Sequence, residues 1–150
     1  MATQTPAEAM RQAGEHWLAN CAPHAKSVHR RWEAGKLAAV PSGRHWDVVE
    51  APLVRSIEIM PQIRVGALGP VLACARSGRA WWLVPLEAAE QCDDIPDVTV
   101  LPSGTPLLCP PPLRALDGRT WLVRPDGSGQ LTDSLMLGAA FGPGGLAEAW

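Results

Sequence analysis

Apolar side chains recur at intervals of three and four residues in the first part of the chain, which is the spacing of a helix that buries one face. The first such set predicts a helix over residues 6–22, with a proline near its start. Its apolar positions are Met10, Ala13, Trp17, Leu18 and Cys21. A second helix is predicted from Pro23 to Gly35, with Val28 and Trp32 on its buried side. Its other side is basic, as expected of a solvated face.

From residue 41 onward, short apolar runs separated by turn residues predict strands. Residues 70–75 and 79–85 are joined by a Ser-Gly turn, which predicts a hairpin. Further strands are predicted at 45–51, 98–101, 106–109 and 119–124, and short helices at 53–60, 86–92 and 132–141. The predicted fold class is therefore α+β, with a central, mainly antiparallel sheet, helices packed on one face and two N-terminal helices.

Length and composition indicate how the chain is divided into domains and what state its cysteines take. Its 150 residues fit one ordinary domain. We predict an N-terminal helical segment over 1–38, an α+β domain over 39–141 and a flexible tail over 142–150. The four cysteines are scattered and form no CxxC pair, so free, mostly buried thiols are expected.

The charge and hydropathy of the chain limit the kinds of partner that it can bind. The chain carries 13 basic and 15 acidic residues, a net charge of -2, so nucleic acid could be held only by a local patch. No basic segment followed by an apolar run begins the chain, and no stretch approaches the ~20 apolar residues of a membrane span. A cytoplasmic protein without membrane contact is expected.

Four short boxes lie between Gly43 and Val123. In order they are GRHWDVVEA, SGRAWWLVP, LPSGTPLLCPPP and DGRTWLV. Their order and spacing resemble the N-terminal primase-polymerase domain of bacterial and plasmid replication proteins, a member of the archaeo-eukaryotic primase superfamily. The chain is similar also to short actinobacterial proteins that carry a diverged copy of this domain. The resemblance covers a little over half of the chain and implies a nucleotide-binding α+β scaffold.

The residues that the resemblance implies for catalysis are incomplete. Active relatives carry two acidic residues one position apart on a strand, where they hold divalent ions. Asp47 matches the first position, but Val49 stands at the second, and Glu50 points to the opposite face by the period of two. Ala80 replaces the histidine of the second box. Asp47 and Glu50 are therefore vestigial catalytic candidates, and no cofactor or metal is expected.

Residue types that bind metals also occur near the N-terminus. His16, Cys21, His24 and His29 are ligand types, and Cys21 and His24 have a short spacing. Pro23 interrupts the helices between them, and a second close pair is missing. Ordinary helix residues are the favoured interpretation.

Aromatic and basic residues on the predicted strands suggest a ligand surface. Tryptophan can stack on bases and arginine can hold phosphate. The predicted ligand-binding residues are Arg44, Trp46, Ser77, Arg79, Trp81, Arg119 and Trp121. Alternation places Trp81 and Trp82 on opposite faces, so core packing is the competing role for most of the tryptophans.

These observations favour a non-catalytic, degenerate primase-polymerase-like module that binds a nucleotide, a single-stranded nucleic-acid end or a protein partner. One alternative is a small enzyme that reuses a cleft around Asp47 and Arg79, with Asp47 or Glu50 as acid or base. Another is a protein adaptor that acts through the N-terminal helices and the tail ending at Trp150. The adaptor hypothesis predicts that deleting residues 1–38 or 142–150 abolishes a complex while the remaining domain stays folded.

Overall fold

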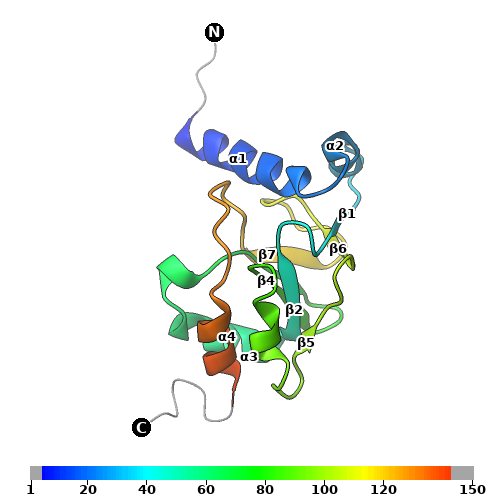
Figure 1. The fold of residues 1–150 in the computed structure, drawn as a ribbon. Coiled ribbons are helices and arrows are strands. Elements are labelled where there is room, and N and C mark those ends of the chain that lie inside the picture. Colours follow the sequence, from blue (N-terminus) through cyan, green and yellow to red (C-terminus); the bar gives the residue numbers. More distant parts are fainter. Residues whose placement is uncertain (1–4, 143–150) are drawn as a thin grey trace.

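The computed structural model describes residues 5–142 (Figure 1). The helices are α1 (Pro6–Asn20), α2 (Ala25–Glu33), α3 (Leu53–Ile59) and α4 (Ser134–Phe141), with short 3₁₀ turns η1 (Met60–Gln62), η2 (Val65–Ala67) and η3 (Ala89–Cys92). The strands are β1 (Ala38–Pro41), β2 (Asp47–Pro52), β3 (Val71–Cys74), β4 (Arg79–Val84), β5 (Thr99–Val100), β6 (Pro106–Cys109) and β7 (Arg119–Val123). The predicted tail lies outside the described residues, apart from Gly142.

The strands form two antiparallel sheets. The larger has five strands in the order β5-β2-β4-β3-β7, and the smaller pairs β1 with β6. β3 and β4 form the predicted hairpin, with Gly78 at a φ of 68° in its turn. The predicted α+β class, antiparallel central sheet and two N-terminal helices are confirmed.

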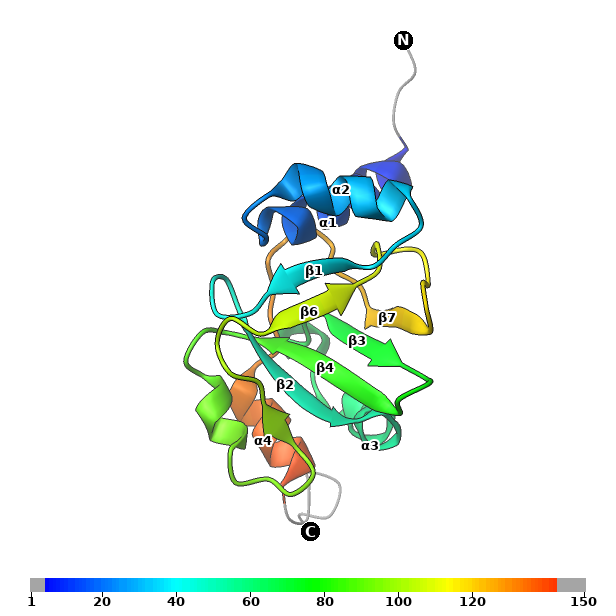
Figure 2. The same cartoon turned by 90° about the vertical axis from the view of Figure 1, so that its right-hand side faces the viewer.

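Hydrophobic cores cover both faces of the five-stranded sheet. One core packs α3 and α4 on the face that carries Val49 and Trp82, which is the predicted helical layer. The other lies on the face of Val48 and Leu83, where it is closed by α1, α2 and the β1–β6 sheet. Figure 2 shows the β1–β6 sheet between the main sheet and the two N-terminal helices. The N-terminal helices therefore share a core with the sheet.

α1 begins at a capping box. The Thr5 hydroxyl accepts from the Glu8 amide, and the Glu8 carboxylate accepts from the Thr5 amide. Leu18 and Cys21 are buried as predicted, but Met10 is 60% exposed and Ala13 is exposed, and Gly14 and Ala19 face inward instead. A Cβ at Gly14 would overlap the carbonyl oxygen of Pro125, so α1 lies directly against the backbone that follows β7.

The end of β6 is tied to α2 and to β7 by three hydrogen bonds. The carbonyl of Leu108 accepts from Arg119 at 2.8 Å, that of Cys109 from the Trp32 indole at 3.0 Å, and that of Pro110 from Trp121 at 2.9 Å. Residues 109–112 are buried. The three prolines at 110–112 have no N–H, so their burial leaves no amide donor without an acceptor. Their fixed φ holds the carbonyls in place.

Candidate functional site

All four tryptophans on or beside the strands of the sheet are buried. Their exposed fractions are 0% for Trp46, 6% for Trp81, 0% for Trp82 and 8% for Trp121. Each indole N–H is satisfied inside the protein; the acceptors are Cys21 Sγ, Glu50 Oε1, Ser56 Oγ and the Pro110 carbonyl, respectively. Trp81 and Trp82 point to opposite faces, as alternation predicted, and both fill cores. The structure corrects the prediction of a stacking surface, because no ring offers an open face to a base.

Charged residues predicted to bind a ligand instead form an internal network. Glu50 Oε1 accepts from the Trp81 indole at 2.9 Å, and its Oε2 lies 3.4 Å from Arg79 Nη2. Arg79 also donates to the Asp97 carbonyl, and the Arg119 guanidinium lies 4.4 Å from the centre of the Trp81 ring. The positive charge of Arg79 is neutralised by Glu50, so Arg79 is not a free anion clamp.

Asp47 holds a backbone turn. Its Oδ2 accepts from the amide of Glu87 at 2.9 Å, and Glu87 has a φ of 67°, a left-handed conformation that side chains rarely adopt. Asp47 pairs with Val84 at one end of the β2–β4 ladder, while Arg79 pairs with Pro52 at the other. This offset is about 17 Å along the strands, and the two residues point to opposite faces. The cleft proposed for the enzyme alternative is therefore not formed by Asp47 and Arg79.

If the role of Asp47 is to hold this turn, Asp47→Ala should lower the free energy of unfolding by about 1–2 kcal/mol, because the Glu87 amide loses its acceptor. Glu87→Gly should raise it by about 1 kcal/mol, because glycine adopts the left-handed conformation without strain. Urea denaturation followed by circular dichroism measures both. Asp94→Ala, at an exposed position, is the control. Unchanged stability in Asp47→Ala would contradict the structural role and leave Asp47 as a candidate for chemistry.

The remaining predicted ligand residues do not converge. Arg44 is exposed in the turn before β2, next to the end of the ladder at which Asp47 lies. Ser77 is exposed in the hairpin turn before β4, at the opposite end of the ladder, where its hydroxyl donates to the Cys74 carbonyl at 3.5 Å. Of the predicted set, the structure brings together Arg79, Trp81 and Arg119 with the vestigial candidate Glu50.

The N-terminal histidines make ring contacts. The rings of His16 and His29 lie edge to face with centroids 5.7 Å apart, and His29 meets Trp32 in the same way. The Cys21 thiol accepts from Trp46 and donates to the Trp17 carbonyl. Within residues 5–142, no group of three or more histidine, cysteine or acidic side chains is arranged to hold a metal ion.

All four cysteines are free and buried, as predicted. Burial raises the pKa of the Cys109 thiol, and it raises that of Cys92 to about 11. The hydroxyl of Ser77 lowers the pKa of Cys74, in the hairpin close to the surface. Cys74 is therefore the thiol among the four whose surroundings favour the thiolate.

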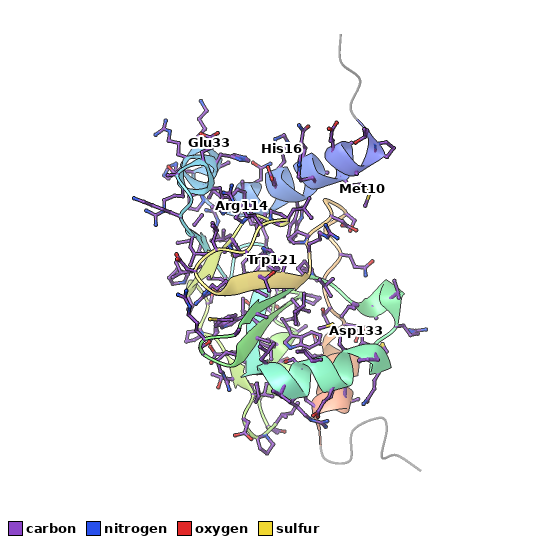
Figure 3. The ribbon with its side chains drawn as sticks, turned by 180° about the vertical axis from the view of Figure 1, so that it is seen from behind. Met10, His16, Glu33, Arg114, Trp121 and Asp133 are labelled. Atoms are coloured by element: carbon purple, nitrogen blue, oxygen red, sulfur yellow. The ribbon has the colours of Figure 1, made fainter. Side chains whose placement is uncertain are left out.

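A groove separates α1 and α2 from the loop after β6. Its volume is about 480 Å³. It is lined by Arg11, Gln12, Glu15, His29, Trp32, Glu33, Pro111, Leu113 and Arg114. Figure 3 shows Glu33 and His16 on the helices above the loop that carries Arg114. Arg114 is anchored there by donating to the Trp32 carbonyl. We call this surface the helical groove.

The helical groove continues along α1 into a second hollow of about 280 Å³, with which it shares Arg11 and Leu113. This part is mainly apolar. Met10 is 60% exposed and Leu113 is 47% exposed, although both line a concave surface. Charged side chains of both signs therefore line the two hollows together with exposed apolar side chains. Nothing in the sequence of residues 111–114 predicts that they face α1.

Comparison of the chain with protein-family models, curated proteins and solved structures found no match. The resemblance to the primase-polymerase domain therefore stays a prediction. In the part of the chain that the structure describes, none of the helices combines the length and the apolar character needed to cross a bilayer.

Proposed function

We propose that this protein is a non-catalytic binding module that holds a segment of a protein partner in the helical groove. The observation that carries the proposal is the exposure of Met10 and Leu113 inside a concave surface rimmed by charges. Protein interfaces typically place apolar and methionine side chains at the centre and polar groups at the rim. Exposed apolar side chains that line a hollow are typical of a recognition surface.

The charges of the groove favour a polypeptide over a phosphate polymer. Arg11 lies near Glu15 and Glu33 along the same lining, so both signs are present. In the described residues none of these three side chains forms an ion pair. A phosphate chain would be attracted by Arg11 and Arg114 but repelled by both glutamates. A peptide with side chains of both signs can satisfy the arginines and the glutamates.

The proposal modifies the function favoured by the sequence. A degenerate primase-polymerase-like scaffold would still explain the vestigial Asp47, but the sheet face around Arg79 and Trp81 is closed by its own contacts. Nucleotide binding at that face ranks second, because it would require Arg79 to leave Glu50. Binding through the N-terminal helices requires no such rearrangement.

Site-specific photo-crosslinking in the native host tests the proposal. A photoreactive residue at Leu113 should give one adduct of defined mass, and one at Val54, which is 71% exposed on α3, should not. Arg11→Glu with Glu33→Lys should abolish the adduct. The partner, identified from the adduct and purified, should bind that double variant at least about tenfold more weakly, a loss of ~1.4 kcal/mol.

Two results would overturn this function. Equal crosslinking at positions 54 and 113 would mean that the groove has no special role. A saturable change in tryptophan emission on titration with nucleoside triphosphates or single-stranded DNA, absent in Arg79→Ala, would move the binding site to the sheet face.

A further inference from the structure

Charges of opposite sign are gathered at two ends of the molecule. The basic end lies on and just after α2 and comprises Lys26, Arg30, Arg31 and Lys36, all exposed. The acidic end comprises Glu87, Glu90, Asp93, Asp94 and Asp97, also exposed. Neither lysine nor arginine occurs between Arg79 and Arg114. Figures 1 and 2 both place α2 at the top of the molecule and residues 87–97 towards the bottom.

The basic end borders an apolar hollow on the side of α2 opposite the helical groove. The hollow measures about 290 Å³ and lies over the outer face of the β1–β6 sheet, where Leu108 is 42% exposed. Val28 forms its floor from α2, and Arg31 lies at its edge, held by a bond to the Leu37 carbonyl. The single acidic residue of α2, Glu33, lines the helical groove instead.

The acidic end has complementary features. Leu86, 43% exposed, directly precedes Glu87, and the carboxylate of Asp47 is bonded to the Glu87 amide. Arginines approach only its margins. Arg79 bonds to the Asp97 carbonyl, Arg55 shares a hollow with Asp97, and Arg44 lies in the turn before Asp47. Among the described residues, no ion pair involves Glu90, Asp93 or Asp94.

We propose that the acidic end of one copy of this chain docks on the basic end of a second copy, with Leu86 entering the hollow beside Leu108. This surface is distinct from the helical groove and does not depend on the proposed function. The two contacting surfaces differ and lie at opposite ends, so each contact leaves one basic and one acidic end free. Such a heterologous contact builds open chains rather than a closed dimer. Because the charges are solvated, the association is weak and is screened by salt.

Sedimentation velocity of the purified full chain tests this inference. At about 0.05 M salt the weight-average mass should rise with protein concentration, and at about 0.5 M salt it should return to the monomer value, since charges are screened there. Replacing all four basic residues of the basic end by glutamine neutralises that end: Lys26→Gln, Arg30→Gln, Arg31→Gln and Lys36→Gln. The acidic end is neutralised by Glu87→Gln, Glu90→Gln, Asp93→Asn, Asp94→Asn and Asp97→Asn. Arg64→Gln, exposed on another surface, is the matched control and should assemble like the wild type.

The mixing experiment distinguishes this geometry from others. Each neutralised variant alone should stay monomeric, and an equimolar mixture should stop at a one-to-one dimer, because only one pair of intact ends remains. A wild type that stays monomeric at low salt overturns the inference. So does a basic-end variant that self-associates normally, or a basic end that binds single-stranded DNA while the protein shows no self-association. None of these outcomes bears on crosslinking at Leu113, so the two proposals fail separately.

Discussion

Replacing Trp82 by alanine is expected to lower the free energy of unfolding by about 3–5 kcal/mol. Trp82 is fully buried on β4 between Val49 and Val71 and meets the Phe141 ring edge to face at 5.9 Å. The loss is a large part of the roughly 5–15 kcal/mol that stabilises an ordinary domain. The variant should therefore unfold at a clearly lower urea concentration than the wild type.

Equilibrium urea denaturation measures this loss. Ser56→Ala removes the acceptor of the Trp82 indole, which lies at 3.1 Å, and should cost about 1–3 kcal/mol while the ring stays in place. Val54→Ala is the control, at an exposed position of α3, the helix that also carries Ser56. It should change the free energy of unfolding by less than about 0.5 kcal/mol. A cost for Trp82→Ala below that of Ser56→Ala would contradict the packing described for this core.

Deleting residues 1–37 is expected to abolish cooperative folding. The deletion removes Leu18, Val28 and Trp32, which share a core with the main sheet, and it leaves the Cys109 carbonyl without its indole donor. Full burial of each large apolar side chain contributes about 1.5–3 kcal/mol, so their combined loss rivals the stability of the whole domain. This expectation opposes the adaptor hypothesis, in which the rest of the chain stays folded without residues 1–38.

Near-UV circular dichroism and a thermal scan of the truncated protein test this expectation. The truncated chain should lose near-UV ellipticity and show no sharp transition, whereas Met10→Ala, on the exposed side of α1, should melt like the wild type. A truncated protein with a sharp transition near that of the full chain would show that the sheet and α3–α4 fold alone. The wall of the helical groove that α1 and α2 form would then belong to a detachable segment.

Local patterns were sufficient for much of the fold. The strand at 106–109 has the predicted bounds. The last helix ends at the predicted residue and begins two residues after its predicted start, where Asp133 caps it by accepting from the Met136 amide. The hairpin was predicted from a Ser-Gly turn between two apolar runs. β1 was missed because Ala38–Pro41 is short and made of small residues, and its partner lies far along the chain.

The candidate site was harder to predict because it, too, depends on contacts between distant parts of the chain. Alternation correctly separated Trp81 from Trp82 and Asp47 from Glu50, but it could not show that both faces of the sheet are covered. Without the β1–β6 layer, the face of Trp81 is expected to be open to a ligand. The helical groove depends on contact between α1 and the loop at 111–114, and tertiary packing of this kind leaves no local periodicity in the sequence.

The ties between the N-terminal helices and the end of β6 also set an order of assembly during synthesis. The Trp32 indole donates to a carbonyl 77 residues later in the chain. α1 and α2 leave the ribosome early, yet their core cannot close until β6 has emerged and paired with β1. Contacts between distant residues form slowly because a long loop must close first. The N-terminal quarter of a nascent chain therefore exposes Leu18, Val28 and Trp32 until most of the protein has been translated, which makes it the natural segment for a chaperone to hold.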